Sequence, residues 1–186
     1  MSTEVLVIIV LAICAIILLA VAIAERRKVR RLRIKYGPEY QRLVEQEHGR
    51  TRRADHILEA REKRVQKLRI RHLTTSECDE LANQWRLIQE EFVDNPTAAV
   101  TRADSLVTRA MAARGYPMSD FEQRAADISV EHPQLVTDYR IAHDISERDH
   151  VGQATTEELR RAMQHYRSLF EQVLESHVMH PAEVRP

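Results

Sequence analysis

Two Glu-x-x-His pairs are the first feature of this sequence that could carry chemistry: Glu45 with His48, and Glu147 with His150. On a helix, this spacing turns both side chains to one face, as in the ligand sets of di-iron carboxylate bundles. Such a centre also needs carboxylates from two further helices. Both pairs here lie beside a glycine, where a helix is expected to end. A histidine near the negative end of a helix dipole explains both pairs without a metal.

His143 is a separate candidate because it lies on the apolar side of a predicted helix, with Tyr139 and Ala142. A histidine in that position could act as a general base. A core histidine that makes one ring hydrogen bond is the more common situation. The sequence therefore favours a chain without a catalytic site and predicts no cofactor. The alternative is a metal-binding or metalloenzyme site formed by His143, Glu147 and His150.

The signatures of other common sites do not occur in the sequence. There is no G-x-S-x-G, P-loop, G-x-G-x-x-G or C-x-x-C motif, the patterns typical of hydrolase, nucleotide and redox sites. Cys78 falls on an apolar helix face, where a thiol behaves as a small hydrophobic group with a raised pKa. Cys14 lies within an apolar run, so the two cysteines predict no disulfide and are typical of a reducing compartment.

That apolar run precedes all the polar candidates. Val5–Ala24 contains no Asp, Glu, Lys or Arg, and a helix of about 20 residues spans the roughly 30 Å of bilayer hydrocarbon. Residues 1–4 lack the basic charges that open a secretory leader. The sequence therefore predicts a retained transmembrane helix over residues 5–24, with a leader cleaved after Ala24 as the alternative.

Basic residues follow the apolar run and none precedes it, which by the positive-inside rule predicts a cytoplasmic C-terminal domain and an external N-terminus. The residues predicted to contact lipid are Arg26, Arg27, Lys28, Arg30, Arg31, Arg33 and Lys35. Residues 25–75 carry 17 Lys and Arg against 7 Asp and Glu, whereas residues 76–186 carry 11 against 20. Because basic juxtamembrane segments are attracted to anionic headgroups, membrane contact is favoured over nucleic acid.

The elements that must position these residues are predicted to be helices throughout, because glycine is scarce and no segment alternates with period two for long. Residues 25–72 predict a charged helical arm, broken at Gly37 and Gly49, which is either an extended stalk or folded back. Residues 73–176 predict a small helical bundle, and residues 177–186 a flexible tail. The fold class is all-α. Capping boxes are predicted at Thr74–Glu77, Ser119–Glu122 and Thr155–Glu158.

Several different short motifs follow the apolar run along the chain. They are Tyr36-Gly-Pro-Glu-Tyr40, Trp85 with Gln89 and Phe92-Val-Asp94, Arg114-Gly-Tyr-Pro117, Phe121-Glu-Gln-Arg-Ala-Ala-Asp127, Ser129-Val-Glu-His-Pro133, Tyr139-Arg140 with Ala142-His143, and Thr156-Glu-Glu-Leu-Arg160 with His165-Tyr-Arg167. Together they resemble a family of uncharacterised bacterial proteins with one membrane helix and a helical cytoplasmic domain. The resemblance implies that architecture and a bacterial inner membrane. It implies no reaction, ligand or partner, and residues 72–82 are less typical of the group.

These observations lead to one main hypothesis, in which the chain is a single-pass inner-membrane protein whose helical cytoplasmic domain binds another protein. The predicted partners are inner-membrane lipid and an unidentified cytoplasmic or membrane protein, with a homo-oligomer left open and no nucleic acid. The retained apolar run and the charge difference between the two halves support this hypothesis. The protein is then an adaptor and not a catalyst.

Overall fold

The computed structural model describes residues 3–175 of the chain, with side chains from Leu11 to Leu174. The described residues form eight helices and no strand, which confirms the all-α prediction. The tail predicted over 177–186 lies outside the described residues, as do Met1 and Ser2 of the predicted N-terminal segment. The chain divides into two compact units, Met1–Leu58 and Glu59–Pro186. Residues 59–72, assigned to the arm from the sequence, therefore belong to the second unit.

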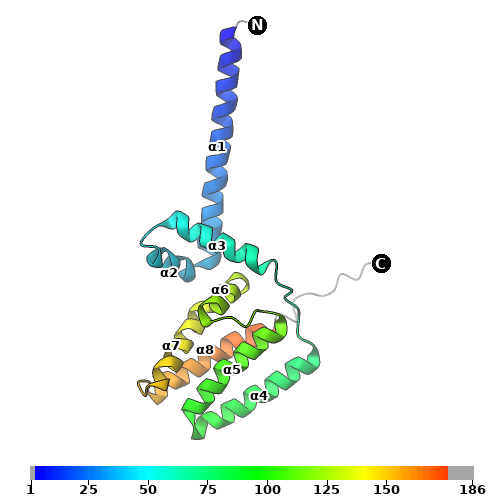
Figure 1. The fold of residues 1–186 in the computed structure, drawn as a ribbon, viewed down its shortest axis with the longest axis vertical. Helices are drawn as coiled ribbons and strands as arrows, with labels where there is room; N and C mark the ends of the chain where they lie inside the picture. Colours follow the sequence, from blue (N-terminus) through cyan, green and yellow to red (C-terminus); the bar gives the residue numbers. More distant parts are fainter. Residues whose placement is uncertain (1–2, 176–186) are drawn as a thin grey trace, which may run out of the picture. The chain divides into compact units, whose positions relative to one another are not determined.

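The first unit contains α1 (Thr3–Tyr36), α2 (Pro38–Gln46) and the beginning of α3 (Thr51–Val65). The chain turns at Gly37, where φ is +47°, and again at Gly49, where φ is +80°. Both turns bring α2 and α3 back onto the end of α1 (Figure 1). The buried side chains that join the three helices are Leu32, Tyr36, Tyr40, Leu43, Ala54 and Leu58. The part of the predicted arm that belongs to this unit, residues 25–58, is thus folded back on itself.

The described side chains of α1 before this small core have no neighbours to cover them. Every residue from Leu11 to Lys28 is exposed, and the large apolar side chains between Leu11 and Ile23 expose 42% to 71% of their surface. Within the part of the chain that the structure describes, no helix is both long enough and apolar enough to cross a membrane.

The second unit is a bundle of five helices that follow the end of α3: α4 (Thr75–Asp94), α5 (Pro96–Arg114), α6 (Phe121–Glu131), α7 (Val136–His150) and α8 (Thr156–Glu175). Helix α5 lies between α4 and α8, and it also contacts α7 (Figure 1). Helix α7 packs on α8 and on α6. Helical spacing predicts apolar faces such as that of Leu81, Trp85 and Ile88, and these faces form the core.

Two of the three predicted capping boxes occur. Thr74 Oγ accepts from the Glu77 backbone N–H at 3.3 Å while the Glu77 carboxylate accepts from the Thr74 N–H at 2.8 Å. Thr155 and Glu158 make the same two bonds. The prediction for Ser119 is wrong, because Asp120 caps α6 by accepting from the Gln123 N–H at 2.9 Å. Ser119 instead belongs to the preceding turn, where its N–H donates to the Pro117 carbonyl at 2.9 Å.

The sequence predicts one helix that begins at Pro133 and another from Arg50 to about Arg71, and the structure differs at one end of each. Helix α7 begins at Val136 and not at Pro133, and α3 ends at Val65 and not near Arg71. The segment that follows α3 leaves the helical conformation because its Leu68 and Ile70 pack against the bundle core. The last turn of α3 is held by an ion pair of 3.0 Å from Arg64 to Asp127, a carboxylate only 1% exposed. Burial raises the pKa of Asp127, and Arg64 opposes that shift.

At Gly115, the linking segment between α3 and α4, residues 66–74, meets the end of α5 without space for a side chain. This glycine ends α5 in the left-handed conformation with φ +99°, and a Cβ at this position would lie 2.6 Å from the Arg69 carbonyl oxygen. The Arg71 N–H donates to the Arg114 carbonyl at 2.8 Å just beside it. Only glycine satisfies both the backbone angle and the close approach.

We expect Gly115→Ala to cost more stability than Gly152→Ala. Gly152 also has a positive φ, +69°, but nothing lies within 4 Å of its added Cβ, so Gly152→Ala should cost about 1–2 kcal/mol for the left-handed backbone alone. Gly115→Ala adds the clash with Arg69, worth roughly a further 1–3 kcal/mol. Urea unfolding of the full chain in detergent, followed by the fluorescence of the single tryptophan, Trp85, measures both. Equal losses would contradict the close approach.

Candidate functional site

The seven predicted lipid-contacting residues lie together on the last turns of α1, and we call them the basic collar: Arg26, Arg27, Lys28, Arg30, Arg31, Arg33 and Lys35. Two of them also take part in the packing of the first unit. The Arg33 guanidinium lies 5.5 Å from the centre of the Tyr40 ring, and the Lys35 ammonium lies 5.1 Å from that of Tyr36. Arg26, Arg27 and Arg30 are exposed. The contact of the collar with lipid stays a prediction.

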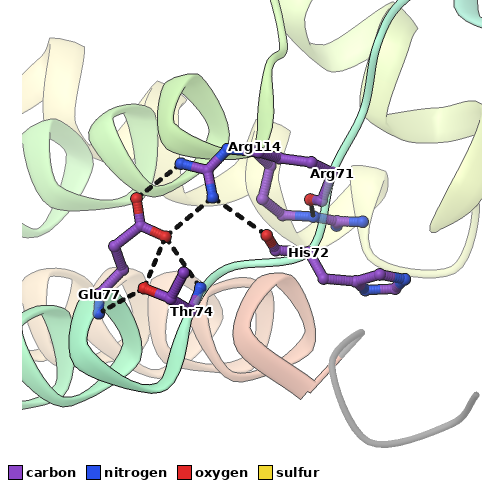
Figure 2. Close-up of polar contacts among 5 residues, drawn as sticks. All are labelled: Arg71, His72, Thr74, Glu77 and Arg114. Atoms are coloured by element: carbon purple, nitrogen blue, oxygen red, sulfur yellow. Dashed lines mark hydrogen bonds and ion pairs between the residues drawn. The ribbon is translucent and has the colours of Figure 1, made fainter. Parts of the chain in front are cut away.

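A polar junction joins the linking segment to the bundle, and Figure 2 shows its five residues: Arg71, His72, Thr74, Glu77 and Arg114. The Arg71 guanidinium donates to the two carboxylate oxygens of Glu77 at 2.6 and 2.8 Å and to the His72 carbonyl at 3.1 Å. Arg114 Nε donates to the Arg71 carbonyl at 3.4 Å. The hydrogen bonds from Arg71, and then those from Thr74, lower the pKa of Glu77 to about 2. These contacts fasten the chain at the start of α4.

A second polar cluster surrounds one carboxylate oxygen of Glu131, at the end of α6. The Tyr116 hydroxyl donates to Glu131 Oε2 at 2.7 Å, and Arg114 Nη2 donates to the same atom at 3.3 Å. His132 Nε2 lies 3.9 Å from it. Arg114 is only 4% exposed. Burial lowers the pKa of His132, as does the neighbouring Arg114, while Glu131 opposes the shift. The cluster holds the ends of α5 and α6 together.

His143 belongs to a third cluster, formed by α5, α6, α7 and α8. Its imidazole stacks on the Phe121 ring with centroids 3.6 Å apart, and its Nδ1 lies 3.9 Å from Asp104 Oδ1. The side chains of Tyr139 and Tyr166 are fully buried, with ring centroids 6.3 Å apart. Burial raises the pKa of Tyr166, and the Asp104 carboxylate adds to the shift. We call this group the Asp104 cluster.

Several polar atoms of the Asp104 cluster are buried without a hydrogen-bond partner among the described residues: Asp104 Oδ1, Thr108 Oγ1, His143 Nδ1 and Tyr166 Oη. They converge from three helices, α5, α7 and α8. Such groups stabilise a bundle in one arrangement only when they pair with each other, since each unpaired buried group costs free energy. The sequence pattern indicated that His143 faces the core, but it did not identify Asp104 and Phe121 as its neighbours.

The alternative metal site is not assembled from its three predicted ligands. Glu147 and His150 are exposed on α7, whereas His143 is three-quarters buried against Phe121 and Asp104. Among the described residues, no group of three or more His, Cys, Asp or Glu side chains could hold a metal ion. Burial raises the pKa of the Cys78 thiol, as expected for a thiol on an apolar helix face.

Two clefts open on the surface of the bundle. The α4–α8 cleft, of about 170 Å³, is lined by Trp85, Gln89, Phe92, Arg160, Met163, Gln164 and Arg167. The α4–α5 cleft, of about 290 Å³, is lined by Gln84, Leu87, Ile88, Arg102, Ser105 and Arg109. No member of the three polar groups described above lines either cleft. The clefts therefore present apolar, arginine and amide surfaces, which suit binding more than acid–base chemistry.

Sequence reasoning missed both clefts. Helical spacing places Trp85, Phe92 and Met163 on apolar faces of their helices, but the sequence indicated neither Arg160 nor Arg167 as a site residue. The available signal was their helical spacing with Met163, one turn away on either side. Comparisons with protein-family models, with curated proteins and with solved structures found no match for the chain. The resemblance to a bacterial membrane-protein family stays a prediction.

The lowered pKa of His132 predicts that acid weakens the fold at this point. The folded state disfavours the protonated imidazole, so the contribution of His132 is complete above its ordinary pKa of about 6.5 and declines as the pH falls below that value. We expect His132→Gln to lose less stability than the wild type between pH 7.5 and pH 5.5. Urea midpoints of the full chain at the two pH values, followed by Trp85 fluorescence, give the comparison.

His150, which is exposed on the same bundle, provides the matched control for this measurement. His150→Gln removes the same ring from an exposed position, so it separates the general effect of losing a histidine from the effect on the Glu131 cluster. A wild-type loss identical to that of His132→Gln would show that the Glu131 cluster does not respond to protonation of His132.

Proposed function

We propose that this protein is a membrane-anchored helical adaptor. In this proposal, residues 5–24 cross the inner membrane once with the N-terminus outside. The basic collar lies against anionic lipid, and the cytoplasmic bundle binds another protein. The single observation that carries the proposal is the combination, on α1, of a charge-free run of 20 residues with the basic residues that follow it directly.

The exposure of α1 supports the anchor. A helix that is apolar all round is stable when apolar material covers it, as in a protein core or a membrane, and each Å² of apolar surface left in water costs about 25 cal/mol. The described part of the run, Leu11–Ala24, is exposed. These 14 residues alone fall short of the roughly 20 that a span needs. Together with Val5–Val10, whose side chains precede the described ones, the run reaches that length.

The arrangement of the bundle supports binding as its role. The buried polar clusters tie helix ends and neighbouring helices to each other, and their residues do not line the two clefts. A metal-binding or metalloenzyme role for His143, Glu147 and His150 has less support, because the last two side chains are exposed and apart from the Asp104 cluster.

The anchor makes a direct prediction about extraction and topology. A chain that carries a C-terminal tag should resist alkali extraction from membranes, and the tag should be protected from protease added to spheroplasts. A chain released as soluble protein, or a digested tag, would contradict the anchor or its orientation. The mass of the mature N-terminus then identifies cleavage after Ala24 if it has occurred.

The basic collar makes a second prediction. Replacing Arg26, Arg27 and Arg30 by glutamine should reduce the phosphatidylglycerol that remains bound to the chain after extraction in a mild detergent, because each charge near the surface contributes about 1 kcal/mol. Mass spectrometry of the retained lipid measures the loss. The matched control replaces three exposed bundle arginines, Arg86, Arg102 and Arg161, by glutamine. Equal lipid retention in the two variants would argue against the collar as the contact.

A further inference from the structure

The lining of the α4–α8 cleft has the composition of a protein interface. Its apolar part consists of Trp85, Phe92 and Met163, and its polar part of two arginines and two glutamines. Aromatic residues, methionine and arginine are enriched in interfaces, whereas Lys, Glu, Asp, Ser and Ala are depleted, and none of those five types lines this cleft. Trp and Arg are also the residues that most often dominate binding energy.

The cleft lies between α4 and α8, which both pack on α5 and contact each other through side chains. The Trp85 ring stacks on Phe170 of α8 with centroids 4.9 Å apart, at an interplanar angle of 17°. Trp85 and Met163 are 6% and 8% exposed. These two buried side chains form the apolar base of the cleft, and the arginine and glutamine side chains form the polar part of its lining. A partner side chain can therefore be placed on a surface that is already ordered, which lowers the entropy cost of binding.

The two arginines of the cleft can accept a new carboxylate at small cost. Arg160 pairs with Glu157 at 2.5 Å, and Arg167 pairs with Glu171 at 2.7 Å, each within α8. All four side chains are about half exposed or more, and exposed pairs of this kind contribute little to stability. Neither glutamate lines the cleft. A carboxylate brought into the cleft would meet two guanidinium groups and no acidic side chain of the lining.

We propose that the α4–α8 cleft is the docking site for an acidic segment of the partner protein. An apolar side chain of that segment packs on Trp85, Phe92 and Met163, and a neighbouring Asp or Glu pairs with Arg160 or Arg167. The proposal rests on the proposed adaptor function and adds the chemistry of the partner to it. The charge of the lining, two arginines and no acid, is what selects this class of partner.

The first experiment uses a random library of 12-residue peptides, selected on the full chain in phosphatidylcholine nanodiscs at 0.15 M salt. We expect enrichment of Asp or Glu next to Leu, Ile or Phe. Selected peptides are then synthesised without tryptophan, so that Trp85, the only tryptophan of the chain, reports occupancy of the cleft through its fluorescence. Selected peptides without acidic residues, or peptides that bind without changing the Trp85 emission, would overturn the proposal.

Matched variants separate the cleft from the basic collar, which also attracts acidic peptides. The double variant Arg160→Gln, Arg167→Gln should bind the selected peptides roughly tenfold more weakly, whereas Arg161→Gln should bind like the wild type. Arg161 is exposed on the same helix and does not line the cleft. Replacing the peptide's acidic residues by amides should weaken binding to the wild type and not to the double variant. Equal affinity for all chains would overturn the proposal.

A further comparison distinguishes failure of the cleft from failure of the adaptor function. The wild type and the double variant are purified from membranes in mild detergent, and the proteins bound to each are identified. A partner with an acidic segment that is lost from the double variant supports the docking site. The same partner on both chains leaves the adaptor function in place and overturns the cleft. A second copy of this chain, lost in the double variant, would overturn the proposed acidic partner in favour of self-association.

Discussion

The packing of α5 is the constraint on which the rest of the bundle depends. Its side chains Ala99, Ala103 and Ala110 are fully buried, and their small size allows neighbouring helices to approach closely. Leu106 and Val107 fill the remaining space at the same face. Helices α4, α7 and α8 all contact this one helix. A larger residue at any of the alanines would push a neighbouring helix away, at a typical cost of about 1–3 kcal/mol.

The same arrangement explains where polar groups can lie in the bundle. The C-terminal end of α5 carries Arg114 and Gly115, which join the linking segment and α6 through backbone and side-chain contacts. The middle of α5 carries Asp104 and Thr108, which face His143 and the buried tyrosines. Helices α4 and α8 both pack on α5, and they contact each other through the stacked rings of Trp85 and Phe170. The α4–α8 cleft lies beside this contact. The polar clusters therefore lie within the bundle, whereas the cleft lies at its surface.

Local signals predicted the local features of this fold. Thr74 and Thr155 are followed three residues later by glutamate, and both form the expected caps, while the chain turns with positive φ at Gly37 and Gly49, where breaks were predicted. The predictions were wrong where contacts between residues far apart in the sequence determine the backbone conformation. Residues 66–71 have a helix-compatible sequence, but the Arg71–Arg114 backbone bond and the packing of Leu68 and Ile70 stabilise another conformation. The preference of single residues cannot reveal such a contact.

The candidate sites were less predictable than the fold for the same reason. The basic collar is contiguous in sequence, so its residues could be identified directly. The α4–α8 cleft instead combines residues from positions 85–92 and 160–167, and no pattern within either helix indicates that the two faces meet. His143 shows the intermediate case, because its apolar side was apparent from helical spacing while its contacts with Phe121 and Asp104 depend on the packing of α6 and α5 against α7.

Charge gives the proposed docking site its selectivity. Residues 76–186 carry 11 Lys and Arg against 20 Asp and Glu, so most of the bundle repels an acidic segment as well as an anionic bilayer. The lining of the α4–α8 cleft carries two arginines and no acid, and the glutamates that pair with these arginines lie outside the lining. An acidic partner is then disfavoured over the bundle surface generally and favoured at one place, which discriminates better than attraction alone. In the proposed adaptor, the basic collar makes the complementary contribution at the membrane, because attraction between basic side chains and anionic lipid is confined to within about 8–10 Å of the headgroups at physiological salt.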